Sequence, residues 1–254
     1  MRPARVILEI AVGTLDDALA AQAGGADRIE LNVAMPLGGL TPSVGLLREV
    51  KRRVRLPVMA MVRPRPGGCC YSPADFDVLC RDVEAVLAEG ADGVVFGILQ
   101  PSGEIDVDRC RQVMRIVNQR VPAVFHRAFD LTPDPFAALE QLIDLGFRRV
   151  MTSGQEASAY DGIWRIASLL DEADGRIEIL PAGGINRHNI ADIVTRTCCD
   201  QIHCGLRKTF VDSSATRHPH VRFTSAPRFV ESEYEGTDEA AVAHLRSMLN
   251  DAVS

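Results

Sequence analysis

One stretch of the chain changes abruptly from apolar to chemically active side chains. Val124 and Phe125 are followed by His126 and Arg127 and, after two more apolar residues, by Asp130. Imidazole, guanidinium and carboxylate groups this close together can exchange protons and bind anions, and burying all three requires partners. A single histidine in an apolar run is more often a hydrogen-bonded core residue. The functional interpretation therefore depends on whether similar residues follow other apolar runs.

Apolar, β-rich runs do recur, and they alternate with segments of helical periodicity. The eight runs lie at about residues 6–12, 28–33, 57–63, 93–99, 122–129, 149–154, 178–184 and 201–206. Eight such units in this length are typical of a closed (β/α)8 TIM barrel with parallel strands. An open doubly wound sheet would carry a GxGxxG turn after its first strand, and residues 12–15 offer none. We therefore predict a single TIM-barrel domain over residues 1–254, with the barrel at about 6–206.

The alternating pattern stops after the eighth run. A polar stretch follows, and we predict an extended loop over about 207–236 and a C-terminal helix over about 237–252. Two interpretations stay open for this segment. It is either a surface loop with a docked helix, or a lid or oligomer contact beside the barrel mouth.

In a parallel barrel the C-terminal ends of all strands open on one face, so polar residues at the ends of different runs converge there. Glu9 and Glu30 belong to neighbouring strands about 5 Å apart. Two carboxylates that close cannot both ionise cheaply, so one has a raised pKa or a cation lies between them. A buried Glu–Arg network that satisfies itself is the structural alternative. The residues predicted to be catalytic are Glu9, Glu30, Arg63, His126, Arg127 and Asp130.

In the functional interpretation, Glu9 or Glu30 acts as base or acid with His126 as partner, while Arg63 and Arg127 hold substrate oxyanions. The loops after the last two strands, including Gly183-Gly184, are where barrel enzymes frequently bind phosphate. Tight βα turns also need glycine, so an ordinary turn stays open there. The residues predicted to bind ligand are Asn32, Arg65, Thr152, Ser153, Gly183, Gly184, His203 and Arg207.

Metal binding has a weaker basis in the sequence. The spacings HExxH and CxxC are absent. One interpretation is a thiol-rich copper(I) site near the mouth, and the alternative is ordinary packing of the thiols. Its predicted ligands are Cys204, His203, Cys69 and Cys70.

Composition limits the partners and the compartment. The 28 basic and 34 acidic residues give a formal charge of −6, which argues against a nucleic-acid surface or an anionic membrane anchor. We expect neither a signal peptide nor a membrane span. The seven cysteines are an odd number without a CxxC pair. We therefore expect reduced thiols in a cytoplasmic protein.

Five segments together resemble the CutC family of copper homeostasis proteins. They are GGADRIEL at 24–31, GGLTPS at 38–43, RPR at 63–65, FHRAFD at 125–130 and TSG at 152–154. The likeness runs in order over about residues 6–206. It implies a TIM-barrel-like cytoplasmic protein, usually a homo-oligomer, that is linked to copper tolerance and described as copper-binding.

Copper is the cofactor that this resemblance implies, and no other cofactor is expected. Family members often carry cysteine at the positions of Ala11 and Asn32, so copper binding through those thiols is not expected in this chain. The polar residues of the mouth match the family: Glu9, Glu30, Arg63, Arg65, His126, Arg127 and Asp130.

Three functional hypotheses follow. The first is a CutC-like protein of copper homeostasis. The second is a metal-independent enzyme that uses acid/base chemistry on a small anionic or phosphorylated metabolite, with Asn32 as a neutral orienting group. The third is a non-catalytic regulatory barrel. The expected partners are a small anionic ligand and further copies of the chain in a dimer or tetramer, with neither nucleic acid nor membrane.

Overall fold

A parallel β-barrel forms the centre of the protein. The computed structural model describes residues 5–223 and 229–253. The barrel strands are β1 (Ile7–Val12), β2 (Arg28–Leu31), β3 (Val58–Met61), β4 (Gly93–Phe96), β5 (Ala123–Phe125), β6 (Arg149–Thr152), β7 (Glu178–Pro181) and β8 (Gln201–Cys204). They pair in chain order, and β1 also pairs with β8. A single bridge between Ala182 and His203 brings β7 to β8, so the predicted (β/α)8 barrel is confirmed and nearly closed.

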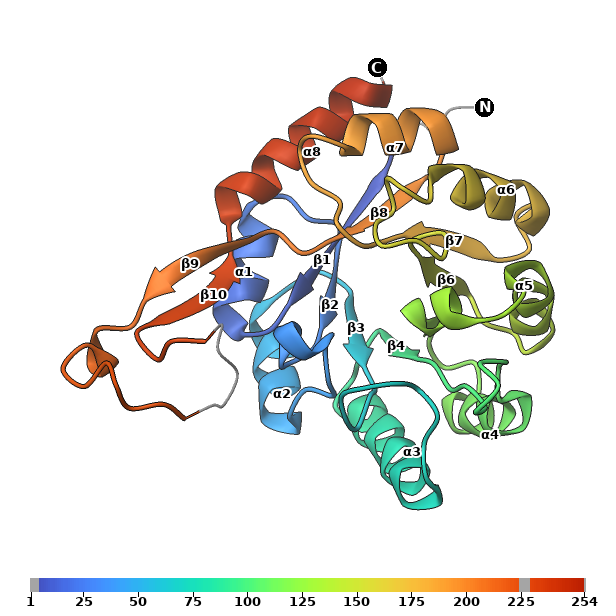
Figure 1. Cartoon of the computed structure of the whole chain (residues 1–254), viewed down its shortest axis with the longest axis horizontal. Coiled ribbons are helices and arrows are strands. Elements are labelled where there is room, and N and C mark those ends of the chain that lie inside the picture. Colours follow the sequence, from blue (N-terminus) through green and yellow to red (C-terminus); the bar gives the residue numbers. More distant parts are fainter. Residues whose placement is uncertain (1–4, 224–228, 254) are drawn as a thin grey trace.

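Helices alternate with the strands and surround the barrel (Figure 1). They are α1 (Leu15–Ala23), α2 (Val44–Arg53), α3 (Pro73–Ala88), α4 (Val107–Val117), α5 (Pro135–Asp144), α6 (Ile163–Ala173), α7 (Ile190–Thr197) and α8 (Glu239–Val253). Short 3-10 helices are η1 (Met35–Leu37), η2 (Arg127–Leu131) and η3 (Ser213–Ala215). None of the helices in the described ranges is long and apolar enough to cross a membrane.

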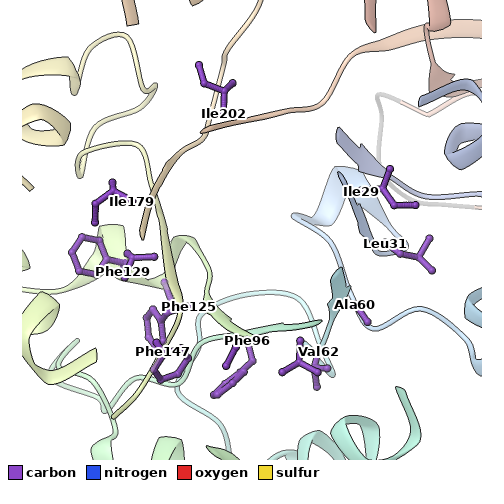
Figure 2. Packing of buried hydrophobic residues seen from close by; sticks show 14 of the residues in the cluster. Ile29, Leu31, Ala60, Val62, Phe96, Phe125, Phe129, Phe147, Ile179 and Ile202 are labelled. Carbon is purple, nitrogen blue, oxygen red and sulfur yellow. The ribbon is translucent and has the colours of Figure 1, made fainter. Parts of the chain in front are cut away.

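The apolar core lies between the strands and the helices. Side chains alternate along a strand, so in β1 Leu8 and Ile10 join this core while Glu9 points into the barrel. Figure 2 shows the aromatic part of the core. The ring of Phe147 lies 5.1 Å from Phe96 and 5.5 Å from Phe125, which is contact distance for aromatic pairs. This layer holds the strands in position and frees the barrel interior for other residues.

The barrel interior is only partly apolar. Two small apolar groups fill part of it, and their members are Met59, Met61, Val95 and Val124 in one and Met151, Leu180 and Ala182 in the other. Strands β1, β2 and β8 instead send Glu9, Arg28, Glu30 and His203 inward, since the neighbouring positions belong to the outer core. Buried charges need partners, so this side of the interior is where a polar network must form.

The chain after β5 differs from the prediction. The run at 122–129 was expected to be one strand, but β5 ends at Phe125 and η2 begins at Arg127. His126 caps η2, because its Nδ1 accepts a hydrogen bond from the Ala128 N–H at 3.1 Å. This local bond turns the chain out of the sheet and places His126 and Arg127 at the barrel mouth.

The predicted loop over 207–236 contains regular structure. Strands β9 (Arg207–Val211) and β10 (Glu233–Thr237) form an antiparallel hairpin that projects beside the barrel (Figure 1). The segment 224–228 of the predicted loop lies outside the described residues. The predicted C-terminal helix is α8, and it packs against both α7 and α1. It therefore fills the eighth helical position of the barrel.

Candidate functional site

A cavity of about 570 Å³ opens at the C-terminal ends of the strands. This volume suits a small metabolite. Its charged and polar lining residues are Glu30, Asn32, Arg63, His126, Arg127 and His203. Its glycines are Gly38, Gly39, Gly67, Gly183, Gly184 and Gly205. Four of the six predicted catalytic residues line the cavity, whereas Glu9 and Asp130 lie behind its wall.

Glu30, Asn32 and His203 form what we call the acceptor end of the cavity. Asn32 donates its amide to Glu30 Oε2 at 3.0 Å, and His203 Nε2 lies 3.9 Å from the same oxygen. Behind them, His203 Nδ1 lies 2.7 Å from Glu9 Oε1. Glu30 Oε1 and Asn32 Oδ1 are buried and have no hydrogen-bond partner among the described residues. The cavity therefore meets two unsatisfied acceptor oxygens at this end.

The pKa values of the two glutamates are shifted in opposite directions. Burial acts to raise the pKa of Glu9, but the Arg28 charge and the His203 hydrogen bond outweigh it and lower that pKa to about 2. For Glu30, burial is the largest influence and the Glu9 charge adds to it; although His203 opposes both, the pKa rises to about 7. Glu9 is therefore a permanent anion, and Glu30 can exchange a proton near neutral pH.

A buried network below the cavity holds Glu9 in place. Arg28 contacts Glu9 and also donates to Gln201 Oε1 at 3.0 Å. Arg149 donates to the same Gln201 oxygen at 2.7 Å and pairs with Glu178 at 2.5 Å. Sequence reasoning missed these residues. A signal was present, because Arg28 and Gln201 each lie two positions before a mouth residue and so share its face of the strand.

His126 is held as a neutral hydrogen-bond donor. Its Nδ1 accepts from the Ala128 N–H, which can only donate, so the ring proton is on Nε2. That Nε2 is buried and has no partner among the described residues. Burial, together with the nearby Arg63 charge, lowers the pKa of His126 to about 4. At neutral pH the ring therefore offers one N–H group to the cavity.

Asp130 positions Arg127 and the loop after β6. Arg127 Nε donates to Asp130 Oδ2 at 2.8 Å, and its Nη2 donates to Ser153 Oγ at 2.6 Å. Asp130 also accepts from Thr152 Oγ1 at 2.5 Å and from the Ser153 N–H at 3.0 Å. Thr152 and Ser153 are fully buried and do not line the cavity. Both residues were predicted to bind ligand, and in the structure they bond to Asp130 behind the cavity wall.

Arg63 holds loops together. Its Nη1 donates to the carbonyl oxygens of Leu37 and Gly39, both at 2.9 Å, and its Nη2 donates to Gly67 O at 2.6 Å. Three of its five N–H groups are thus taken by the loops after β2 and β3, and those groups are not free for the predicted oxyanion. Arg63 contributes positive charge and the shape of the cavity wall.

Two arginines predicted to bind ligand lie outside the cavity. Arg65 donates to Asp75 at 2.8 Å and to carbonyl groups of its own loop. Arg207 belongs to β9, donates to Glu235 O at 2.6 Å and lies 4.0 Å from Asp17. The hairpin after β8 draws Arg207 away from the mouth, which the sequence pattern alone did not indicate.

Gly183 and Gly184 line the cavity, as predicted for a ligand-binding turn. A Cβ atom on Gly183 would lie 3.2 Å from both Cζ and Nη1 of Arg127. The φ angle of Gly183 is +100°, a conformation that other residues rarely adopt. Glycine thus allows the Arg127 guanidinium to lie directly against the turn after β7.

One group of side chains in the described ranges is close enough to hold a metal ion. One ligand atom from each of Glu9, Glu30 and His203 lies within 4.8 Å of the others. Carboxylate and imidazole donors suit hard or borderline ions better than copper(I). Both Glu9 oxygens already bond to Arg28 and His203, so hydrogen bonding and charge pairing account for this group without an ion.

The predicted thiol site does not assemble. Cys204 is buried in the outer core, whereas His203 points into the barrel, because adjacent strand residues face opposite sides. Cys70 is exposed, so Cys69 is the one predicted thiol that lines the cavity. Burial raises the pKa of Cys69 and keeps it a thiol, while copper(I) sites use thiolates. Of the four predicted ligands, the mouth therefore offers copper(I) one thiol and one imidazole, Cys69 and His203.

The fold and the cavity define a (β/α)8-barrel protein with a polar, small-molecule-sized site at the C-terminal ends of its strands. The model of the CutC family matches residues 6–208. The chain is 46% identical over 234 residues to a family protein CutC of Treponema denticola, which covers 91% of this chain and 95% of that protein. The chain belongs to the CutC family, so the predicted resemblance is confirmed.

Two further relatives carry the same family name. The human "Copper homeostasis protein cutC homolog" is 39% identical over 242 residues, which are 95% of this chain and 88% of that protein. A solved structure of CutC from Streptococcus agalactiae has a TM-score of 0.74 and 30% identity, and it covers 78% of this chain and 97% of that one. Family and fold therefore agree.

Proposed function

We propose that this protein is an enzyme that transfers protons on a small, oxygen-rich anionic metabolite bound in the mouth cavity. One observation carries the proposal. Glu30 and His126 line the same cavity, and each has a buried polar atom without a partner among the described residues. One is an acceptor oxygen and the other a ring N–H donor. Leaving both unsatisfied costs free energy that a bound ligand recovers.

The two groups have complementary roles in such a reaction. Glu30 takes a proton from a ligand carbon or hydroxyl group and returns it to a neighbouring atom, so no electrons leave the ligand. His126 donates its Nε2–H to the carbonyl oxygen on which negative charge develops. A carboxylate base with a neutral imidazole donor is the pair that barrel isomerases use to form enediolates. Asn32 and His203 orient the hydroxyl groups of the ligand at the acceptor end.

The surroundings of Glu30 support this role. Its pKa of about 7 lies near the value that favours general acid–base catalysis at neutral pH. Glu9 remains ionised and fixes the orientation of His203, so the acceptor end is already organised before a ligand enters.

A ligand screen followed by an exchange measurement tests the proposal. Thermal shift is measured with hydroxy-carbonyl compounds, sugar phosphates and small carboxylates on the wild type, Glu30→Gln and the control Glu172→Gln, which changes an exposed residue of α6. Each stabilising compound is then incubated in D2O, and loss of its C–H signal is followed by NMR. We expect exchange with the wild type and the control, and a loss of about 100-fold or more with Glu30→Gln.

Two results would contradict the enzyme. One is the absence of any stabilising compound in the screen. The other is C–H exchange that continues at the wild-type rate in Glu30→Gln. Binding without exchange in the wild type would instead favour the non-catalytic regulatory barrel.

A second candidate is a role in copper homeostasis. The specific observation is the name of the human relative, which is 39% identical to this chain. A direct role predicts that copper(I), titrated against a competing chelator, binds the wild type through Cys69, the cavity thiol. The Cys69→Ser variant would then no longer bind copper. The control variant Cys198→Ser, at an exposed residue directly after α7, would still bind it. Equal binding by all three proteins, or none, would exclude a copper site at the mouth.

A further inference from the structure

The cavity has a second end with the opposite hydrogen-bonding character, which we call the donor end. It comprises His126, Arg127, Gly184 and Ile185, all of which line the cavity. The backbone N–H groups of Gly184 and Ile185 make no hydrogen bond to the described residues, and neither does Arg127 Nη1. The buried Nε2–H of His126 is also without a partner. Four unpartnered donor groups of three kinds therefore belong to residues that line this end of the cavity.

The guanidinium of this end is fixed in direction. Asp130 and Ser153 bind Arg127 Nε and Nη2, which leaves Nη1 as its free edge. That edge lies against Gly183, where a Cβ atom would come within 3.2 Å of it. The side chain is 42% exposed, so a ligand can reach it from the cavity. An arginine already oriented in this way loses little side-chain entropy when it binds an anion.

The two ends of the cavity also differ in charge. The acceptor end contains Glu30 with Glu9 directly behind it, and its unpartnered atoms are acceptor oxygens, to which an anion cannot donate. The donor end presents a guanidinium and N–H groups only. An anionic metabolite is therefore held in one orientation, with its anionic group at the donor end and its hydroxyl groups at the acceptor end.

We propose that the donor end binds a phosphate group, so that the substrates of this protein are small phosphate monoesters of hydroxy-carbonyl compounds. This inference rests on the proposed function, because it names the substrate class of the same cavity. A phosphate monoester presents three terminal oxygens, enough to accept from Arg127 and from the two backbone N–H groups, which leaves the His126 N–H for the carbonyl oxygen. A carboxylate carries one negative charge, whereas a phosphate monoester carries nearly two at neutral pH, so the phosphate gains more from the Arg127 guanidinium.

Phosphate binding is tested with inorganic phosphate as the probe, by calorimetry, with acetate as the competing anion. The proteins are the wild type, Arg127→Gln, Gly183→Ala, Glu30→Gln and the control Arg111→Gln, an exposed arginine of α4. Gly183→Ala keeps every charge but displaces the Arg127 guanidinium. It therefore tests whether the position of the guanidinium matters, even if Arg127→Gln proves to be destabilised. Circular dichroism and the melting temperature of each variant show that it is folded.

We expect phosphate to bind the wild type and Arg111→Gln equally, and to bind Arg127→Gln and Gly183→Ala about tenfold or more weakly. Glu30→Gln is expected to bind phosphate at least as tightly as the wild type, because it removes a negative charge from the opposite end. Wild-type affinity in both Arg127→Gln and Gly183→Ala would overturn the inference, as would acetate binding as tight as phosphate binding. Arginine-dependent phosphate binding without D2O exchange would support this site while contradicting the proposed enzyme.

Discussion

His203 donates its Nδ1–H to Glu9 Oε1 across 2.7 Å. The direction of this bond is set by Glu9, whose pKa of about 2 makes it an anion that can only accept. The partnership leaves Nε2 of His203 on the cavity side, 3.9 Å from Glu30. A carboxylate thus selects the imidazole tautomer from behind, as carboxylates do for histidines in many active sites.

Removing the charge of Glu9 should destabilise the fold. Glu9→Gln keeps the shape of the side chain but leaves Arg28 buried without its anion. We expect a loss of about 3–5 kcal/mol in the free energy of unfolding, measured by urea denaturation. The exposed control Glu172→Gln should stay within about 0.5 kcal/mol of the wild type. A loss of less than about 1 kcal/mol in Glu9→Gln would show that Arg28 does not depend on this pair.

Glu30 should make stability depend on pH in the opposite direction to an ordinary surface carboxylate. Its folded pKa of about 7 lies above the ordinary value of 4.5, so the wild type loses stability as pH rises from 4.5 through 7. Glutamine at this position has no carboxyl group to deprotonate, so the Glu30→Gln variant does not show this loss of stability. Relative to the wild type, it should gain on the order of 3 kcal/mol between pH 4 and pH 8. A difference in unfolding free energy that is constant over this range would contradict the raised pKa.

His126 should remain neutral across the physiological range. Burial, with the Arg63 charge, lowers its pKa to about 4, so its charged form is populated only below that pH. Long-range ¹H–¹⁵N NMR spectra should show the Nε2–H tautomer unchanged from pH 5 to pH 8. A titration of His126 near pH 6 would remove its role as a neutral donor.

The docking of α8 should be sensitive to one small substitution. A Cβ atom on Gly24 would lie 2.6 Å from Cβ of Val242 and 2.8 Å from Glu239 O. Gly24→Ala should therefore push α8 from its position and cost about 1–3 kcal/mol in thermal or urea unfolding. The matched control is Gly68→Ala, because a Cβ atom there meets nothing within 4 Å. Equal stability of the two variants would mean that α8 adjusts freely.

The fold was largely predictable from local patterns. Eight apolar runs alternating with helical segments indicated the barrel, because period-2 strands and crossover helices are encoded in consecutive residues. The predicted runs are longer than the strands in the structure. In the run at 122–129, the strand ends at Phe125, and His126 caps the 3-10 helix that follows. The β9–β10 hairpin was missed, since its strands are polar and exposed and carry no apolar alternation.

The sequence by itself determined which side chains reach the mouth, because topology brings the strand ends of Glu30, His126 and His203 to one face. Only the tertiary structure decided what each group is free to do. Arg63 and Asp130 were predicted as site residues, yet their hydrogen bonds are consumed by loops distant in sequence, whereas Arg127 keeps one free edge. The strands and their order can be predicted from local sequence patterns, because they depend on residues that are neighbours along the chain. The availability of a hydrogen-bonding atom depends on every residue that packs around it, and those residues come from the whole barrel.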